Sequence, residues 1–296
     1  MKFVRYLHEK SEGYGILTEN GKVLCMPSLA KRLNKQAPRT LEGFIRTNSG
    51  KKAEKTLRNA SRNFVDKASI PLDKVKLLAP IVNPPKIICL GLNYRDHAAE
   101  QNAPIPEEPI IFFKPRTAIV GPYGDIVKPS FVKSLDYEAE LAVVVGEKAK
   151  NVSISEAERY IFGYTVLNDV SARDIQFKDK QWTRGKSFDT FAPMGPCIVT
   201  KDQVGNVLNL RIRTWVNGEL RQNSTTKNMV FNVYEVIHHL SKVMTLEPCD
   251  VIATGTPAGV GFAMKPEAKF LNSGDIVKIE IENIGVLENR VVEVKP

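Results

Sequence analysis

The stretch Leu135-Asp136-Tyr137-Glu138-Ala139-Glu140-Leu141-Ala142-Val143-Val144-Val145-Gly146 predicts the centre of this fold. Its second half is a short apolar run that ends in glycine, which is typical of a buried strand. Because successive strand side chains alternate between the two faces, Glu138 and Glu140 are expected to point the same way. Two neighbouring carboxylates at the mouth of a buried strand repel each other. Solvent, a shared proton or a cation must therefore offset that repulsion.

Two interpretations of this pair are open. Both carboxylates face water on an edge strand, or they belong to a divalent metal site built from oxygen ligands. A metal site needs a further carboxylate, and Asp169 ends the apolar strand predicted at Ile161–Leu167, although Asn168-Asp169 is equally typical of a turn. Glu138, Glu140 and Asp169 together are a donor set that suits Mg²⁺ or Mn²⁺. No histidine or cysteine adjoins them in the sequence, which disfavours zinc.

Composition places the chain among ordinary globular proteins. Its 296 residues are 43% hydrophobic and 25% charged, which suits one large domain or two smaller ones. No charge-free apolar run approaches the roughly 20 residues of a membrane helix, and the N-terminus lacks the apolar core of a signal peptide. We therefore expect no membrane association and a cytoplasmic location. The four cysteines form no Cys-x-x-Cys pair and are expected to be small buried residues of a reduced protein.

Positive charge is concentrated near the N-terminus. Residues 1–80 hold 17 of the 42 Lys and Arg residues but only 7 of the 33 Asp and Glu residues. This region reads as a small basic α/β domain, and the proline-rich Ala79–Pro85 predicts the boundary with a second domain at 84–296. The charges are scattered and no recognition motif accompanies them, so we expect no nucleic-acid binding. The elements expected here are strands at Lys2–Leu7, Tyr14–Thr18 and Val23–Met26 and helices at Ser28–Leu33, Leu41–Ile45 and Lys51–Phe64.

Strands dominate the second part of the chain, with few helices between them. This pattern predicts a predominantly β fold with inserted helices (α+β) and argues against a doubly wound nucleotide-binding fold. Asn217-Gly218 indicates a hairpin turn. The expected strands are Lys86–Gly91, Ile110–Lys114, Ile126–Val127, Tyr137–Val145, Ile161–Asp169, Cys197–Thr200, Leu210–Val216, Val251–Ala253, Asp275–Ile281 and Arg290–Val294. The expected helices are Ser155–Tyr160 with Ser153 or Ser155 as N-cap, and Asn232–Met244, while Asn93–Gln101 is expected to be a short helix or a loop.

Histidines and a lysine are candidates for acid–base chemistry. His97 and Glu100 share one face of a helical turn, where the carboxylate fixes the imidazole tautomer and raises its basicity; a surface ion pair is the alternative. His238 and His239 lie in an amphipathic helix, which favours a structural role, with one facing the core and the other solvent. Lys186 could stabilise a developing oxyanion, although most lysines are solvated.

A glycine-rich segment, Gly255–Gly261, follows the strand predicted at Val251–Ala253. Its backbone N–H groups and the Thr256 hydroxyl could hold a substrate carboxylate, whereas a simple glycine-rich turn is the alternative. The segment lacks Gly-Lys-Ser/Thr and the dinucleotide glycine spacing, which excludes a phosphate loop of either kind.

The order of the motifs is more informative than any one of them. The chain resembles the fumarylacetoacetate hydrolase family over residues 84–296, and the preceding region resembles the variable N-terminal domain of many members. The form Gln181-Trp182-Thr183-x-Gly185-Lys186-Ser187 resembles the branch with oxaloacetate decarboxylase-like members and acylpyruvate hydrolases. The motifs are Gly91-Leu92-Asn93-Tyr94-x-Asp96-His97-x-x-Glu100, Phe113-Lys114-Pro115, Asp136-Tyr137-Glu138-x-Glu140-Leu141, Asn168-Asp169-Val170-Ser171-Ala172-Arg173-Asp174-x-Gln176, Gly185-Lys186-Ser187-Phe188-Asp189-Thr190 and Thr254-Gly255-Thr256-Pro257-x-Gly259-Val260-Gly261.

The resemblance implies a mixed β-sandwich or roll, usually a homodimer, with Mg²⁺ or Mn²⁺ as cofactor. It implies a water-activating dyad on a mobile lid and several residues that contact a small 2-oxo acid. Carried over by motif, the metal ligands are Glu138, Glu140 and Asp169, the catalytic residues are His97, Glu100 and Lys186, and the substrate-binding residues are Gln176, Thr256, Arg173 and Gly255.

The reaction implied is cleavage of a C–C bond in a 2-oxo (1,3-dicarbonyl) acid through a metal-stabilised enolate. Acylpyruvate or fumarylpyruvate hydrolysis and oxaloacetate decarboxylation both fit this description. One alternative is an isomerase or hydratase of 2-hydroxyhepta-2,4-diene-1,7-dioate-type oxo-dioates. Another is a non-catalytic binding protein that uses the basic N-terminal domain. The loop Pro104–Pro109 and residues 177–184 vary among members and leave the substrate open.

Overall fold

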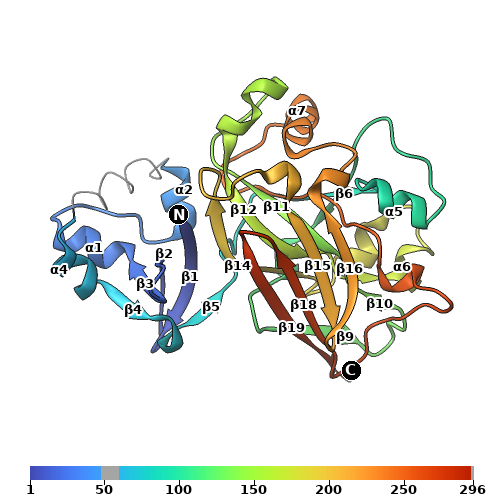
Figure 1. The fold of residues 1–296 in the computed structure, drawn as a ribbon, viewed down its shortest axis with the longest axis horizontal. Coiled ribbons are helices and arrows are strands. Elements are labelled where there is room, and N and C mark those ends of the chain that lie inside the picture. The colour runs from blue at the N-terminus through green and yellow to red at the C-terminus, as the bar shows by residue number, and fades with distance from the viewer. Residues whose placement is uncertain (48–59, 295–296) are drawn as a thin grey trace.

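Two β-sheets packed face to face form the centre of the molecule (Figure 1). The computed structural model describes residues 1–47 and 60–294. One sheet has 12 strands, of which ten run in the order β4-β3-β2-β1-β14-β12-β11-β17-β6-β7, while β5 pairs with β1 and β8 with β14. The other has five strands in the order β16-β15-β18-β19-β9. The expectation of a predominantly β fold with inserted helices is confirmed.

The strands of the larger sheet come from the whole length of the chain. In sequence order they are β1 Lys2–His8, β2 Ser11–Leu17, β3 Lys22–Cys25, β4 Ser69–Pro71, β5 Lys76–Leu78, β6 Ile87–Gly91, β7 Ile110–Lys114, β8 Ile119–Val120, β11 Ala139–Val145, β12 Ile161–Asn168, β14 Ala192–Thr200 and β17 Val251–Ala253. The smaller sheet contains β9 Asp125–Pro129, β15 Arg211–Val216, β16 Glu219–Thr225, β18 Ile276–Ile281 and β19 Gly285–Val294. A separate pair joins β10 Leu135–Asp136 to β13 Ser171–Ala172.

Short helices lie between the strands. The α-helices are α1 Met26–Arg32, α2 Leu41–Arg46, α4 Arg62–Lys67, α5 Arg95–Glu100, α6 Arg173–Gln176 and α7 Val233–Val243. The 3₁₀ helices are η1 Leu72–Lys74, η2 Arg116–Ala118, η3 Ile154–Tyr160, η4 Trp182–Lys186, η5 Val207–Asn209, η6 Thr226–Asn228 and η7 Gly261–Ala263. Within the described residues, no helix is long and apolar enough to cross a membrane.

Strand β11 is buried along its whole length, as its apolar run predicts. It pairs with β12 on one edge and β17 on the other, and all seven of its residues are buried. Strands whose two faces are both covered carry continuous apolar runs rather than alternating ones. The strand begins at Ala139, two residues later than expected from Tyr137, so Glu138 stands at its entrance and Glu140 lies inside it.

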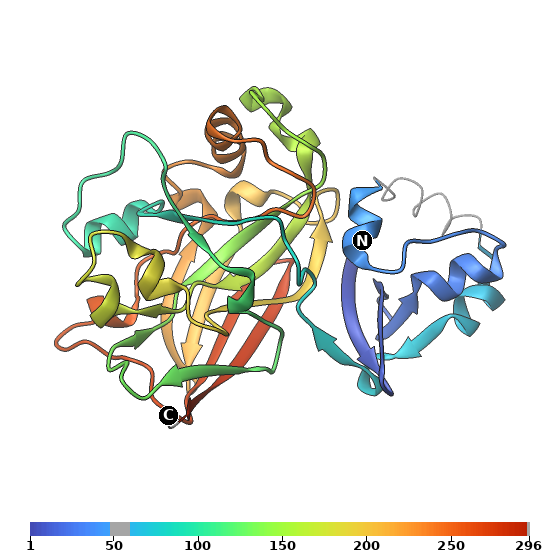
Figure 2. The ribbon, with the colours of Figure 1, turned by 180° about the vertical axis from the view of Figure 1, so that it is seen from behind.

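The N-terminal residues extend the larger sheet. β1 pairs antiparallel with β14, placing Lys2 opposite Val199 and Phe3 opposite Ile198. Phe3 also contacts Phe162, with ring centroids 5.5 Å apart. Figure 2 shows the N-terminal elements, in blue, beside the rest of the chain. The division into domains at 1–80 and 84–296 stays a prediction.

Several local predictions need correction or fall outside the description. The helix expected at 155–160 is a 3₁₀ helix, Ile154–Tyr160; Ser153 stands at its N-cap position, one of the two expected, but its side chain makes no capping hydrogen bond to the backbone. Instead, Ser153 Oγ donates to Glu156 Oε2 at 2.6 Å.

Most of the helix predicted at 51–64 lies outside the described residues. In the described part, α4 begins at Arg62 after the N-cap Ser61.

Helix α7 agrees with its sequence signals. Val233, Val236, Ile237 and Leu240 are buried along one face. Both His238 and His239 are half-buried, not divided between core and solvent as expected, and His238 Nδ1 donates to the Val152 carbonyl at 2.6 Å, a structural contact. All four cysteines are free, and three of them are buried.

The N-terminus of α7 yields a stability prediction. The Asn232 side chain accepts from the Tyr234 and Glu235 amides, while Glu235 Oε2 accepts from the Asn232 amide at 2.8 Å, forming a capping box. Asn232→Ala is expected to lower the free energy of unfolding by about 1 kcal/mol, because it leaves two helix N–H groups without their acceptor. Urea denaturation followed by circular dichroism measures this. Asn232→Ser, which keeps the acceptor, should lose much less; equal losses for both variants would contradict the capping role.

Candidate metal centre and active site

Three buried carboxylates meet where β11 and β12 pair. Ala139 lies opposite Asn168 in the ladder, which brings Glu138 and Glu140 beside Asp169. One carboxylate oxygen from each of the three residues lies within 4.8 Å of the other two. The backbone fixes this approach, because the Asp169 amide donates to the Glu138 carbonyl at 2.9 Å. The predicted ligands are therefore gathered at one point.

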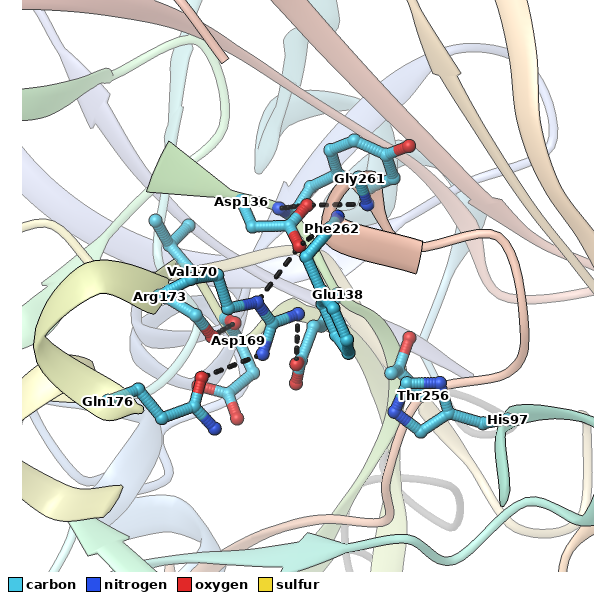
Figure 3. Close-up of polar contacts among 12 residues, drawn as sticks. His97, Asp136, Glu138, Asp169, Val170, Arg173, Gln176, Thr256, Gly261 and Phe262 are labelled. Carbon is cyan, nitrogen blue, oxygen red and sulfur yellow. Dashed lines mark hydrogen bonds and ion pairs between the residues drawn. The ribbon is translucent and has the colours of Figure 1, made fainter. Parts of the chain in front are cut away.

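Cationic side chains surround two of the three carboxylates. Lys186 Nζ lies 2.8 Å from Glu138 Oε2 and 2.7 Å from Asp169 Oδ2. Lys114 Nζ donates to the other Asp169 oxygen. Arg173 Nη2 lies 2.7 Å from Glu138 Oε1 (Figure 3). Both oxygens of Glu138 and both of Asp169 thus face a positive charge.

The unequal surroundings of Glu138 and Glu140 move their pKa values in opposite directions. Burial raises the pKa of Glu138, but the charges of Lys186 and Arg173 outweigh burial and bring it to about 2. Burial and the neighbouring charges of Asp169 and Glu138 hold the pKa of Glu140 well above its usual value of 4.5. The same two acids raise the pKa of Lys186 despite its burial. Glu138 is therefore ionised at neutral pH, whereas Glu140 resists ionisation.

Glu140 carries an unsatisfied atom that suits a cation. Its Oε1 is buried and makes no hydrogen bond, while its Oε2 accepts from the Gly255 amide at 2.7 Å. An orphaned carboxylate oxygen beside two other carboxylates fits a hard divalent cation such as Mg²⁺ or Mn²⁺. The structure also corrects one expectation about Gly255, because its N–H donates to Glu140 and is not free for a substrate carboxylate.

The second group is the pair on α5, where His97 Nδ1 lies 2.6 Å from Glu100 Oε1. The other Glu100 oxygen accepts from the Gly259 amide at 2.9 Å. Since a carboxylate only accepts, Nδ1 carries the proton and Nε2 of a neutral ring is left as a lone pair. Asp96 holds the helix by accepting from Ser224 Oγ at 2.5 Å and from Asn228 Nδ2 at 3.2 Å.

A cavity of about 80 Å³ lies between α5 and the acidic cluster. This volume exceeds the ~10–15 Å³ that one water needs, so it suits a few waters or a small acid. The polar residues that line it are His97, Gln101, Glu138, Arg173, Gln176, Lys186 and Thr256. The cavity therefore brings together all the predicted catalytic and substrate-binding residues except Glu100, which contacts His97, and Gly255, which contacts Glu140.

Two lining residues keep hydrogen-bonding capacity for a ligand. Thr256 Oγ1 accepts from Gln222 Nε2 at 2.8 Å, which leaves its hydroxyl proton free to donate. Gln176 Oε1 accepts from Arg173 Nη1 at 2.8 Å, so its NH₂ group is the end that remains (Figure 3).

Four residues that sequence reasoning left without a role support the site. Asp136 Oδ2 accepts from Arg173 Nε at 2.9 Å and Oδ1 from the Gly261 amide at 2.7 Å, which joins α6 to the glycine-rich segment. Lys114, Gln222 and Gln101 are the others. Asp136 and Lys114 stand inside the quoted motifs, which was a usable signal. Gln222 and Gln101 carry no such signal.

The comparison with protein families gives a clear result. The model of the fumarylacetoacetate (FAA) hydrolase C-terminal region matches residues 86–292. The chain belongs to the fumarylacetoacetate hydrolase family. A fumarylacetoacetate hydrolase domain-containing protein 2 homolog of Dictyostelium discoideum is 46% identical over 98% of this chain and 97% of its own length.

Two further relatives carry functional names. Mitochondrial oxaloacetate tautomerase FAHD2A of Homo sapiens is 46% identical over 86% of this chain and 80% of that protein. The solved structure of maleylpyruvate hydrolase from Sphingobium sp. SYK-6, in complex with manganese(II) and pyruvate, is 29% identical and has a TM-score of 0.80, with both chains fully covered. The family is one of enzymes acting on small molecules. The cytoplasmic location and the homodimer stay predictions.

The raised pKa of Glu140 predicts that metal binding depends on pH. A cation must displace the proton that Glu140 retains, so apparent affinity for Mg²⁺ or Mn²⁺ should rise with pH while that carboxyl loses its proton. Calorimetric titration in buffers of different ionisation enthalpy measures both the affinity and the proton released. An affinity independent of pH, with no proton released, would contradict this account.

Glu140→Gln tests the cluster itself. Removing one of three charged ligands should weaken Mg²⁺ or Mn²⁺ binding by at least about tenfold and reduce the metal-dependent rise in melting temperature. Glu267→Gln, at an exposed residue, is the matched control and should behave as the unsubstituted protein. If Glu140→Gln bound the cation as tightly as this control, the cluster would not be the metal site.

Proposed function

We propose that the chain is a divalent-metal-dependent enzyme that moves a proton at the carbon next to the 2-oxo group of a small 2-oxo dicarboxylate, interconverting the keto and enol forms of oxaloacetate. The observation that carries this proposal is the His97–Glu100 pair, whose Nδ1 and Oε1 atoms are 2.6 Å apart. His97 lines the same cavity as Glu138. The name of the human relative, an oxaloacetate tautomerase, supports the same reaction.

Glu138, Glu140 and Asp169 would hold Mg²⁺ or Mn²⁺. A cation bound there supplies Lewis-acid stabilisation of negative charge on the 2-oxo oxygen of the substrate. The Thr256 hydroxyl and the Gln176 NH₂ group donate to substrate oxygens and fix its orientation. Lys186 and Arg173 keep Glu138 ionised and add positive charge beside the cavity, which favours an anionic substrate.

Proton transfer falls to His97. Its Nε2 takes the proton from C3 of the keto acid, while Glu100 keeps the ring oriented and stabilises the imidazolium that forms. The proton then returns from Nε2 to the substrate oxygen, giving the enol. No atom is gained or lost, and the reverse sequence regenerates the keto acid.

Cleavage of a C–C bond is the second candidate. The same Nε2 lone pair could take a proton from water as that water attacks the C4 carbonyl of an acylpyruvate, and the maleylpyruvate hydrolase with a similar structure favours this reading. Oxaloacetate decarboxylation would use the metal site without an attacking water.

NMR of oxaloacetate, an acylpyruvate and an oxo-dioate in D₂O separates the candidate reactions. Deuterium at C3 with an intact carbon chain supports proton transfer, whereas shortened products support cleavage.

Substitution of the dyad tests the proposed base. His97→Asn and Glu100→Gln are each expected to lower turnover of oxaloacetate between its keto and enol forms by about 10²- to 10⁴-fold, the usual contribution of general base catalysis. Turnover is followed by ultraviolet absorbance of the enol, against the uncatalysed rate. Neither residue belongs to the carboxylate cluster, so metal-dependent stabilisation should persist in both variants. Unchanged turnover in His97→Asn would exclude His97 as the base.

A further inference from the structure

The Gln101 side chain is hydrogen-bonded to Nε2 of His97, the ring nitrogen that accepts the proton in the proposed reaction. It follows α5 directly, lines the cavity, and places its Nε2 2.8 Å from His97 Nε2. Because Glu100 fixes the proton on Nδ1, His97 Nε2 is an acceptor, and the Gln101 NH₂ group is its donor. The His97 Nε2 lone pair, which must take a proton from the substrate, therefore already accepts a hydrogen bond from Gln101 in this structure.

Three other polar residues that line the cavity have partners away from His97. Arg173 and Lys186 are paired with the acidic cluster, and Gln176 is bound to Arg173. Leu92, Phe177 and Phe262 are among the apolar residues that line the cavity and offer no side-chain donor. Among the described lining residues that can donate, Gln101 is thus the one whose NH₂ group is hydrogen-bonded to His97 Nε2, whereas the Thr256 hydroxyl is bonded to Gln222.

We propose that Gln101 is a specificity-determining residue that releases His97 only when the ligand brings a second carboxylate. A hydrogen bond from an amide to a carboxylate is stronger than one to a neutral ring nitrogen, so a 2-oxo dicarboxylate draws Gln101 away and frees Nε2. A 2-oxo monocarboxylate offers no such acceptor, and Gln101 stays on His97. This inference rests on the proposed function and adds the residue that selects a dicarboxylate over a monocarboxylate.

Non-reacting analogues test the selection without turnover. L-Malate and 2-hydroxybutyrate share a 2-hydroxy acid end and differ in a carboxylate against a methyl group at C4. With the Mg²⁺-loaded protein, Gln101→Met should weaken L-malate binding by about 10- to 100-fold, the range for a hydrogen bond to a charged group, and leave 2-hydroxybutyrate binding unchanged or tighter. Gln203→Met, at an exposed glutamine, is the control and should change neither. Equal weakening of both ligands by Gln101→Met would overturn the inference.

A second variant and a second readout guard against a merely structural effect. Gln101→Glu keeps the side-chain shape but replaces the donor by a negative charge, so it should weaken L-malate binding more than Gln101→Met does. In protein with ¹⁵N-labelled histidine, L-malate should shift the Nε2 resonance of His97, whereas 2-hydroxybutyrate should not. A shift of the same size with both ligands would contradict release by the second carboxylate.

The experiments distinguish failure of the proposed reaction from failure of the role of Gln101. If oxaloacetate were not turned over but L-malate still bound selectively through Gln101, the ligand class would stand and the reaction would fall. If oxaloacetate were turned over and Gln101→Met affected both analogues alike, the reaction would stand and the role of Gln101 would fall.

Discussion

Repulsion among Glu138, Glu140 and Asp169 is the constraint on which the rest of the site depends. Three carboxylates with oxygens within 4.8 Å of one another cannot all ionise in a buried place without compensating charge. The protein compensates them unequally. Glu138 and Asp169 face lysines and an arginine on both oxygens, while Glu140 has a backbone amide on one oxygen and nothing on the other. The chain therefore neutralises most of the cluster itself and leaves one position for a proton or a cation.

This arrangement couples the cluster to the cavity. Lys186 on η4 and Arg173 on α6 both compensate the cluster and line the cavity. Exchange of the Glu140 proton for a divalent cation adds one positive charge beside that cavity, which favours an anionic ligand. Asp136 ties Arg173 to the glycine-rich segment, and Gln222 ties the same segment to the smaller sheet through Thr256. Charge and shape at the site are thus set by the same few side chains.

Much of the fold and of the acidic cluster could be predicted from the sequence because their signals are local. The apolar run after Glu140 determines a strand with both faces covered, and the Asn-Gly pair at 217–218 has the positive φ angles that a tight hairpin requires. The partners of the cluster could not be predicted in this way. Whether a lysine pairs with an acid, or the Gly255 amide with Glu140, depends on distances between segments remote in sequence. Gln101 is the extreme case, since its contact with His97 depends on one side-chain conformation.

The pairing of β1 with β14 has a consequence for how the sheet is kept from associating with other chains. β14 lies next to β12, whose end carries Asp169, and its other edge is covered along Lys2 and Phe3 by β1. A bare strand edge exposes unpaired backbone groups that recruit strands from other molecules and lead to aggregation. The N-terminal strand thus shields the edge nearest the carboxylate-bearing ladder. Without β1, the backbone of Ile198 and Val199 in β14 would have no strand partner on this side.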